Sequence, residues 1–523
     1  MLSNQAQRIA IIDLGSNTAR MVVLSTVPGY AYNLDDEIRE VVRLRQGMTK
    51  KGLSTPAISR ALFTLRLFKR FCDGAGVDKI VATTTSAVRE ARNGLLFVDQ
   101  VERDIGLSLQ ILDGEKEAYY GTLGVLNEVP LANGFVVDIG GGSAQISEVR
   151  DRRFKRGAAL QLGSLALTER FVRNDPIDKL EYESVVKEIN RQLDTIPWLK
   201  KAGRKLDMLL VGIGGTIRNL ARIEAVRQAY PLNTLHGFSL SRNSIAKSID
   251  QLRQLSLAGR RKIAGLNSDR ADIILPGAVV IHTIMERLNK ETLTISINGL
   301  REGLFFEQFW QHLSYPVVAD IRRFSVLNMA RVYNYEKQHA AHVRYLANRL
   351  FEQLAPLHGF GRAEQEILDS AALLHDLGTI IDYYDHHKHS QMLITNRGLP
   401  GYSPRETALV ALLTRFHRKG KPSIADFESL LKKGDDLLLI RLAAMLRLAE
   451  FLERGRNANV DDVNAFWDDN NLRLTVVADE YPAVELWQAE KNAASLMEKA
   501  FGRQVLLEST AVPDIWMTKT SED

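Results

Sequence analysis

The sequence predicts a mixed α/β protein that uses one fold twice and continues into a helical region and a small α/β tail. Two similar turns carry most of this prediction. Asp13-Leu-Gly-Ser-Asn-Thr18 and Asp138-Ile-Gly-Gly-Gly-Ser143 each follow one apolar run and precede another, which is typical of a β-hairpin. Strands alternate with helices to about residue 310, which indicates the α/β class. From Tyr315 to Glu453 the pattern changes to amphipathic helices with hardly a strand signal.

The first two domains are expected to follow the same order of elements. In residues 1–126 we expect a hairpin over 9–24, a strand over 38–44, a helix over 55–71, a strand over 79–83, and helices beginning near Ser86 and Gly114. In residues 127–310 we expect a hairpin over 135–149, helices around 160–200, a strand over 208–211, a helix opened by the turn 212–216, and a strand over 293–297.

Two further domains are expected after these. Residues 311–460 should form an all-α domain. Residues 461–523 should form a small α/β domain with a strand over 472–477, a helix over 485–501 and a strand over 504–507. No low-complexity segment separates the domains, so we expect four parts joined by short connections.

Composition narrows the class of protein. The chain has 523 residues, 45% of them hydrophobic, and a modest net charge of +5, which favours a polyanionic partner without arguing for nucleic acid. A single cysteine, Cys72, excludes an intrachain disulfide and fits a reducing cytoplasm. The longest apolar stretch, 273–285, is interrupted by Pro276 and is too short for a bilayer. We therefore expect a cytoplasmic protein without a transmembrane segment or nucleic-acid partner, and peripheral membrane association stays open.

The two turns suggest phosphate binding. Glycine permits positive φ angles and a close approach of the backbone, so that successive N–H groups can face an anion. One such turn would be weak evidence. Two turns in equivalent positions predict two phosphate loops that face one cleft.

Eight motifs in order extend the pattern along nearly the whole chain. They are DLGSNTAR (13–20), TTSAVREA (84–91), DGEKEA (113–118), DIGGGSAQ (138–145), GIGGT (212–216), RADII (270–274), GLREGL (299–304) and LLHDLG (373–378). Together they resemble the exopolyphosphatase / guanosine pentaphosphate phosphohydrolase (Ppx/GppA) family of the actin-like ATPase superfamily. The resemblance implies two ribonuclease-H-like (actin-like) domains around a cleft, then an HD-like helical domain and the small α/β domain.

The resemblance assigns the catalytic and metal-binding roles. Glu117 matches the catalytic glutamate, which accepts a proton from the attacking water. An isolated glutamate would instead be assigned to an exposed helix face. Asp13 and Asp138 stand where relatives hold Mg²⁺, with Mn²⁺ as an alternative ion, although each aspartate could simply cap its own turn. Relatives commonly carry Glu where this chain has Gln145, which leaves a metal role at that position open.

Phosphate contacts are implied for the loops and for several arginines. Hydroxyl and N–H groups would bind phosphoryl oxygens directly, and arginine forks would bind them bidentately. A helix that begins at the turn 212–216 would present its positive end to a phosphate. The residues are Ser16, Asn17, Thr18, Arg20, Arg89, Gly140, Gly141, Gly142, Ser143, Gly214, Gly215, Thr216 and Arg270, with Arg301 as a secondary candidate.

A second constellation lies in the helical region. His339, His375, Asp376 and Glu450 follow the order of the metal site in HD-type phosphohydrolases, with Glu450 where Asp is usual. The longer glutamate side chain would require the backbone to adjust, because metal geometry tolerates little change in ligand distance. We expect these residues to be structural or to bind substrate. A second active centre is the competing interpretation.

The resemblance implies an exopolyphosphatase that removes the terminal phosphate of linear inorganic polyphosphate. The alternative is removal of the 5′ phosphate from guanosine pentaphosphate (pppGpp), because both reactions need the same terminal phosphoryl chemistry. An actin-like ATPase or kinase would need an adenosine pocket that the sequence does not reveal. A non-catalytic nucleotide sensor would be expected to lose Glu117 or the loop glycines. Relatives suggest a homodimer.

Overall fold

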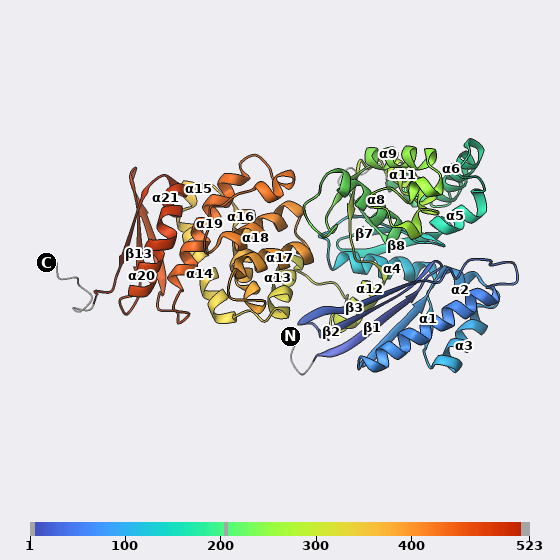
Figure 1. Ribbon diagram of the computed structural model, residues 1–523, viewed down its shortest axis with the longest axis horizontal. Coiled ribbons are helices and arrows are strands. Elements are labelled where there is room, and N and C mark those ends of the chain that lie inside the picture. Colours follow the sequence, from blue (N-terminus) through green and yellow to red (C-terminus); the bar gives the residue numbers. More distant parts are fainter. Residues whose placement is uncertain (1–5, 203–207, 514–523) are drawn as a thin grey trace. The chain divides into compact units, whose positions relative to one another are not determined.

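A computed structural model describes residues 6–202 and 208–513 (Figure 1). The described chain forms two compact units. The larger contains the residues up to Tyr230 together with Leu235–Ile321, and the smaller contains Pro231–Thr234 and the residues from Arg322 onward. Each unit is described separately below.

The larger unit begins with a five-stranded sheet in the order β3-β2-β1-β4-β5. The first three strands are antiparallel neighbours, whereas β4 and β5 run parallel to β1. The elements are β1 Gln7–Leu14, β2 Thr18–Val27, β3 Ala31–Val41, α1 Thr55–Gly74, β4 Lys79–Thr84, α2 Ser86–Glu90, α3 Gly94–Ile105, β5 Leu109–Ile111 and α4 Gly114–Leu126.

The second sheet repeats this topology. Its order is β10-β11-β9-β6-β7-β8, so that β8, β7, β6, β9 and β11 correspond to the five strands of the first sheet, and β10 adds an antiparallel edge. The strands are β6 Gly134–Ile139, β7 Ala144–Arg150, β8 Arg153–Leu160, β9 Leu209–Ile213, β10 Ser239–Ser241 and β11 Thr292–Ile295. The helices are α5 Ser164–Phe171, α6 Lys179–Leu193, α7 Pro197–Ala202, α8 Gly214–Arg227, α9 Arg242–Gln254, α10 Leu257–Arg260, the 3-10 helix η1 Ser268–Arg270, α11 Ile274–Arg287 and α12 Leu300–Phe309.

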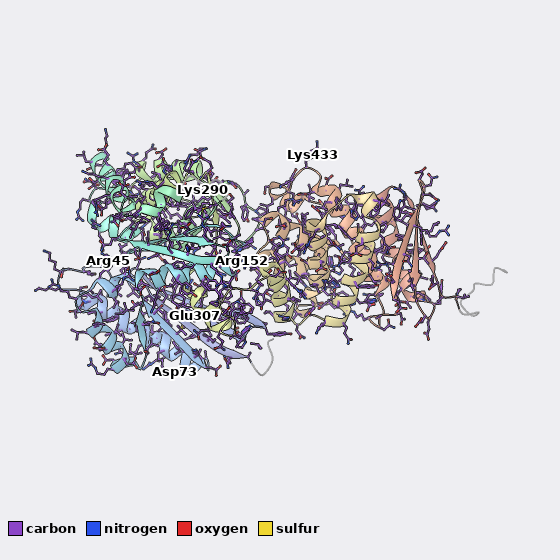
Figure 2. All side chains as sticks on the ribbon, turned by 180° about the vertical axis from the view of Figure 1, so that it is seen from behind. Arg45, Asp73, Arg152, Lys290, Glu307 and Lys433 are labelled. Atoms are coloured by element: carbon purple, nitrogen blue, oxygen red, sulfur yellow. The ribbon has the colours of Figure 1, made fainter. Side chains whose placement is uncertain are left out.

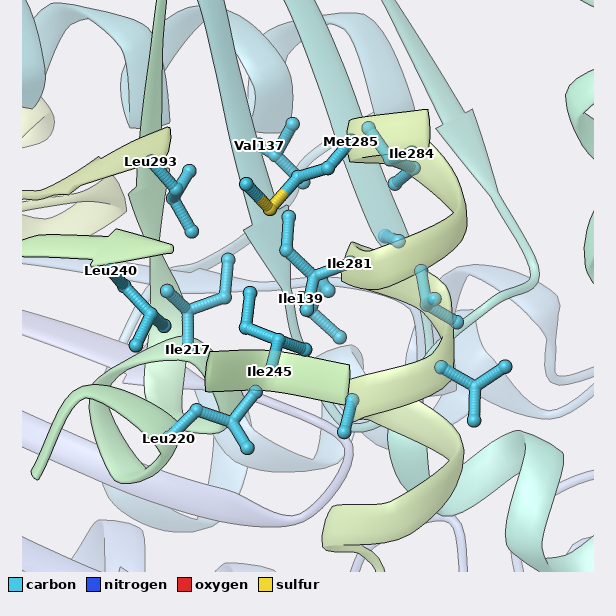
Figure 3. Close-up of a cluster of buried hydrophobic side chains, with 14 of the residues drawn as sticks. Val137, Ile139, Ile217, Leu220, Leu240, Ile245, Ile281, Ile284, Met285 and Leu293 are labelled. Carbon is cyan, nitrogen blue, oxygen red and sulfur yellow. The ribbon is translucent and has the colours of Figure 1, made fainter. Parts of the chain in front are cut away.

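The core of the second sheet lies under α8, α9 and α11 (Figure 3). Val137 and Ile139 of β6 are fully buried against Ile217 of α8 and Ile281 of α11. Side chains on alternate residues of β6 face these helices, as expected for a strand covered on that face. This packing fixes the carboxyl end of β6, where Asp138 and the following turn lie.

Two helices with close backbone contacts join the two sheets. A side chain at Gly124 of α4 would clash with the Gly299 carbonyl, and one at Gly303 of α12 would clash with the Tyr120 carbonyl. The Tyr120 hydroxyl donates a hydrogen bond to the Glu307 carboxylate at 3.0 Å, and Glu307 is labelled in Figure 2. The segments that carry Glu117 and Arg301 are therefore held against each other.

The smaller unit consists of a helical domain followed by a three-stranded sheet in the order β12-β13-β14. The helical elements are α13 Ile321–Val332, α14 Lys337–Gln353, α15 Ala355–His358, α16 Arg362–Leu374, η2 Leu377–Ile380, α17 His386–Arg397, α18 Pro404–Phe416, η3 Ala425–Leu430 and α19 Asp435–Leu452. The terminal part contains β12 Asp462–Trp467, β13 Asn471–Val477, α20 Ala483–Ala489, the π-helical turn η4 Glu490–Ala494, α21 Ser495–Phe501 and β14 Gln504–Ser509.

The predicted fold class is confirmed, although α9, α11 and β12 were not among the expected elements and two edge strands differ from the prediction. β3 covers residues 31–41 where a strand over 38–44 was expected, and β8 was not expected between the hairpin over 135–149 and the helices around 160–200. Both strands are edge or near-edge strands rich in charged residues and largely exposed. Charges on a sheet edge discourage pairing with other chains, and they also hide the apolar alternation on which the prediction rests.

Candidate active site

The two predicted hairpins match in hydrogen bonding and in register. The Gly15 N–H donates to the Thr18 carbonyl at 3.0 Å, and the Gly140 N–H donates to the Ser143 carbonyl at the same distance. In the first hairpin Asp13 lies opposite Arg20, and in the second Asp138 lies opposite Gln145. Arg20 and Gln145 therefore occupy equivalent positions beside equivalent aspartates.

The two turns pack directly against each other. A Cβ atom at Gly141 would lie 3.0 Å from the Cβ of Asn17, and one at Gly142 would clash with the hydroxyls of Ser16 and Ser86. Ser16 and Ser86 are themselves hydrogen bonded at 3.0 Å. Glycine is needed here because any side chain would push the two loops apart.

A single cavity brings most of the predicted residues together, with about 120 Å³ of room for water-sized molecules. The predicted residues that line it are Asp13, Ser16, Asn17, Thr18, Arg20, Glu117, Asp138, Gly140, Gly141, Gly142, Ser143, Gln145, Gly214, Gly215 and Arg270. Arg89 contacts Glu117 from outside this lining, and Thr216 is buried with no hydrogen-bond partner for its hydroxyl. Arg301, the secondary candidate, also lines the cavity.

The turn before α8 brings backbone close to two charged groups. Gly214 has a φ of +88°, and a side chain there would clash with the Asp138 carboxylate. A side chain at Gly215 would clash with the guanidinium of Arg270, which comes from η1. Because these glycines have no side chain, Arg270 can lie over the amino end of α8. The charge of its guanidinium there adds to the positive end of the helix dipole.

Glu117 is held in the first turn of α4. Asp113 caps this helix by accepting a hydrogen bond from the Lys116 N–H at 2.8 Å. The Glu117 carboxylate accepts from Arg89 at 3.2 Å and from the Ser143 hydroxyl at 3.4 Å. Burial raises the pKa of Glu117 to about 7, despite the lowering effect of Arg89. Its carboxylate is therefore able to take up a proton near neutral pH.

Asp13 and Asp138 form a half-buried acidic pair in the same cavity. Burial raises the pKa of Asp13 to about 6 against the lowering effects of Arg301 and Arg20. Burial also raises the pKa of Asp138, with Arg218 as the main opposing charge. The Asp13 Oδ1 atom is buried and has no hydrogen-bond partner. An unpaired carboxylate oxygen at one strand end, with a second carboxylate in the same cavity, fits a hard divalent cation such as Mg²⁺.

Four arginines give the cavity its positive charge. Burial, followed by the neighbouring Arg218 and Arg301, lowers the pKa of Arg20 to about 9. Burial and Arg218 also lower the pKa of Arg270 to about 10, and its buried Nη1 has no hydrogen-bond partner. Like charges so close together are costly without an anion between them. The arrangement is suited to binding several phosphoryl oxygens at once.

Sequence reasoning missed Arg218, which also lines the cavity. It lies on α8, two residues after Thr216, and its Nη1 donates to the Ile297 carbonyl at 2.7 Å. The signal was its place in the first turns of a helix already assigned to phosphate binding. Also missed were lining residues from the 84–91 and 299–304 motifs and their surroundings: Thr85, Ser86, Asn298 and Glu302.

Gln145 is buried in the cavity wall, and its side-chain amide donates to the Ser143 hydroxyl at 2.8 Å. Ser143 in turn donates to Glu117, so Gln145 belongs to a chain of hydrogen bonds that ends at the predicted base. This gives position 145 a positioning role toward Glu117. A metal-binding role for Gln145 stays a prediction.

The second predicted constellation is also assembled, within the smaller unit. The Nε2 atoms of His339 and His375 lie 3.2 Å apart, and Glu450 Oε2 lies 3.2 and 3.1 Å from them. Asp376 lies beside both histidines. The longer glutamate side chain therefore reaches both histidines.

The comparisons with known proteins agree with this architecture. The Ppx/GppA phosphatase family matches residues 22–312, and the family's domain III matches residues 321–494. A crystal structure of a Ppx/GppA family member from Aquifex aeolicus is 27% identical, with a TM-score of 0.51, and the match covers 59% of this chain and 99% of that one. An exopolyphosphatase from Cytophaga hutchinsonii is 25% identical, with a TM-score of 0.54, over 58% of this chain and 98% of its own.

In the described residues no helix is both long and apolar enough to cross a membrane. The chain belongs to the Ppx/GppA phosphatase family.

Proposed function

We propose that the protein removes the terminal phosphate of linear inorganic polyphosphate and releases orthophosphate. The observation that carries this proposal is the meeting of Glu117 with four arginines and two glycine-rich turns in one cavity. The family is a phosphatase family, and one similar solved structure is described as an exopolyphosphatase. Polyphosphate consists only of phosphoryl groups, and the arginines and turns of this cavity are suited to binding phosphoryl oxygens.

The proposed reaction is an in-line displacement by water. The water oxygen forms a bond to the terminal phosphorus, and the bridging P–O bond breaks with its electron pair leaving on the shortened chain. Glu117 accepts the proton that the water loses, while Ser143 and Arg89 hold its carboxylate in place. Arg20, Arg218 and Arg270 stabilise the charge that spreads over the phosphoryl oxygens in the transition state.

Asp13 and Asp138 would hold Mg²⁺, or Mn²⁺ in its place. The ion would supply positive charge to the phosphoryl oxygens, beyond what the arginines provide. The raised pKa values of both aspartates support this role, because a bound cation would compensate for the burial of their charge.

The alternative substrate is pppGpp. Of the described residues that line the cavity, none is aromatic, so the lining offers no ring on which a guanine could stack. This observation favours polyphosphate. The same reaction centre would act on the 5′ phosphate of pppGpp if the base lay outside the cavity.

An assay of orthophosphate release tests the proposal. It compares long-chain polyphosphate, pppGpp and ATP at equal concentrations of terminal phosphate. We expect the highest kcat/KM for polyphosphate and negligible release from ATP. A kcat/KM for pppGpp that exceeds the value for polyphosphate would replace the proposed substrate. Release from none of the three would reject the proposed reaction.

A further inference from the structure

Arg39 lies beside the phosphatase cavity and has no role in the function proposed above. It belongs to β3, the edge strand of the first sheet, and lies directly opposite Arg20 of β2. Residues that face each other across two strands have their side chains on the same face of the sheet. Arg20 lines the cavity, whereas Arg39 is not among the described residues that line it. Arg39 therefore lies just outside the cavity, next to one of its arginines.

An ion pair with the second domain holds the Arg39 side chain. Its Nη1 atom lies 3.4 Å from Oδ2 of Asp269, the residue before Arg270 in η1. The two side chains are 25% and 46% exposed. An ion pair as exposed as this contributes at most about 1 kcal/mol, because water screens it. An anion with better geometry can therefore take the place of Asp269.

The edge of the Arg39 guanidinium that binds oxyanions bidentately is unoccupied. Its Nε and Nη2 atoms are both buried, and neither has a hydrogen-bond partner in the described part of the chain. The N–H groups on these two atoms are parallel and match two oxygens of a carboxylate or phosphate. Arg349 uses the same edge to hold Asp462, at 2.9 and 3.0 Å. Arg39 offers this edge without an anion.

A neighbouring arginine adds to the demand for an anion. Burial, then Arg218 and then Arg39, lowers the pKa of Arg270 to about 10, so the charge of Arg39 acts on Arg270. The Nη1 atom of Arg270 is also buried, without a hydrogen-bond partner in the described residues. Buried donors that lack an acceptor are costly, and so are like charges close together. An anion beside both guanidinium groups would reduce both costs.

We propose that Arg39 forms a second phosphate subsite, which rests on the proposed function and extends it to the next group of the chain. The terminal phosphoryl group would lie at Arg20 and Arg270. The second phosphoryl group would lie where Arg39 adjoins these two residues, on the fork formed by Nε and Nη2. Both polyphosphate and pppGpp carry such a second group, so the subsite does not depend on which of them is the substrate.

The main obstacle to binding is that water does not reach Nε and Nη2 of Arg39. The guanidinium must move to receive a phosphoryl group. The weak ion pair with Asp269 and the partial exposure of the side chain permit this movement. A bidentate, charge-assisted contact with phosphate is stronger than the single contact that is lost.

Two other carboxylates near Arg39 are each neutralised by an arginine of their own. Glu37 lies two residues earlier on β3 and accepts a hydrogen bond from Arg301 at 3.0 Å. Asp272 accepts one from Arg43 at 3.1 Å. These ion pairs offset the charges that would otherwise repel an anion from Arg39.

Equilibrium binding to the full-length protein tests the proposal. Isothermal titration calorimetry in the Glu117→Gln background, at a fixed Mg²⁺ concentration, compares orthophosphate, pyrophosphate and tripolyphosphate. We expect Arg39→Gln to raise the Kd of pyrophosphate and tripolyphosphate about 10- to 100-fold, the usual loss for hydrogen bonds to a charged group. The Kd of orthophosphate should not change, because a single phosphate occupies only the terminal site. Equal weakening of all three ligands, or of none, would overturn the second subsite.

Asp269→Asn separates phosphate binding from a purely structural role of the ion pair. This substitution releases Arg39, so we expect it to lower the Kd of pyrophosphate about two- to fivefold, the range of an exposed ion pair. If Arg39 only held η1 against β3, both substitutions would break the same contact and weaken binding alike. Weaker pyrophosphate binding in Asp269→Asn, to the extent seen in Arg39→Gln, would refute the subsite.

The background protein, with Arg39 intact, distinguishes this proposal from the proposed function. Tight binding of pyrophosphate and tripolyphosphate that is insensitive to Arg39→Gln would reject the subsite alone. Failure of the background protein to bind either ligand would reject the proposed function and the subsite together. Arg66→Gln is the control for loss of one positive charge, because Arg66 is exposed on α1 and does not line the cavity. It should leave all three Kd values unchanged.

Discussion

Glu117 is the residue whose replacement should most clearly separate binding from reaction. Glu117→Gln keeps the shape of the side chain and removes its ability to accept a proton. We expect kcat to fall by about 10²–10⁴, the usual range for loss of general acid–base assistance, with little change in KM. Steady-state phosphate release measures both values.

The matched control for this substitution is Glu115→Gln. Glu115 lies in the same helical turn, is exposed and does not line the cavity. It should retain normal turnover. Near-normal turnover in Glu117→Gln, with its fold confirmed by circular dichroism, would remove Glu117 from the mechanism.

Arg89 should control the pH dependence of the reaction. Glu117 must be deprotonated to accept a proton, and burial raises its pKa to about 7, so activity should fall as the pH drops through about 7. Arg89 lowers that pKa. We therefore expect Arg89→Gln to move the acidic limb of the kcat/KM profile to higher pH.

The exposed neighbour Arg92 provides the control, since it lies in the loop after α2 and has no part in the cavity. Arg92→Gln should leave the acidic limb in place. An acidic limb that stays fixed in Arg89→Gln, or moves to lower pH, would show that Glu117 does not set it.

At the scale of elements, the turn before α8 combines a strand end, a helix start and Arg270. A methyl group at Gly215 would displace the Arg270 guanidinium. Hydrogen bonds to charged groups contribute about 1.5–3 kcal/mol, so Gly215→Ala should raise KM about 10- to 100-fold. Gly74→Ala, in α1, is the control because a methyl group there meets no atom within 4 Å. A KM unchanged in Gly215→Ala would exclude Arg270 from substrate binding.

The elements also show how far the sequence could predict the structure. Both hairpins, the starts of α4 and α8, and the helical domain were predictable because glycine turns and apolar periodicity are local signals. β3 and β8 were not, because charged edge strands lack apolar alternation. Arg218 was missed because its role depends on long-range packing that brings α8 against the Ile297 carbonyl. Bringing His339, His375, Asp376 and Glu450 together likewise requires the tertiary fold.

For the whole molecule, the two compact units predict a division of labour. Every residue of the phosphatase cavity lies in the larger unit. Two similar solved chains match over 99% and 98% of their own length and over only 59% and 58% of this chain. We expect a shortened protein that ends at Ile321 to hydrolyse short polyphosphate and to lose any preference for long chains.

Chain-length profiles of the full and shortened proteins measure this difference. A cooperative thermal transition must first show that the shortened protein is folded. An unchanged preference for long chains would refute the proposed role of the smaller unit, and loss of short-chain hydrolysis from a folded larger unit would place part of the reaction in the smaller one.

The matched hairpins determine the direction in which a phosphorylated chain can lie in the cleft. Two copies of one fold around a cleft create an approximate twofold symmetry, and a symmetric cleft could not distinguish the end of a phosphorylated chain from its continuation. At the two equivalent positions opposite the aspartates, one copy carries the cation Arg20 and the other carries the neutral amide Gln145. Glu117 lies on the side of the neutral amide, linked to it through Ser143. This difference between equivalent positions gives the cleft a polarity, so that a chain has one orientation in which its terminus meets the base.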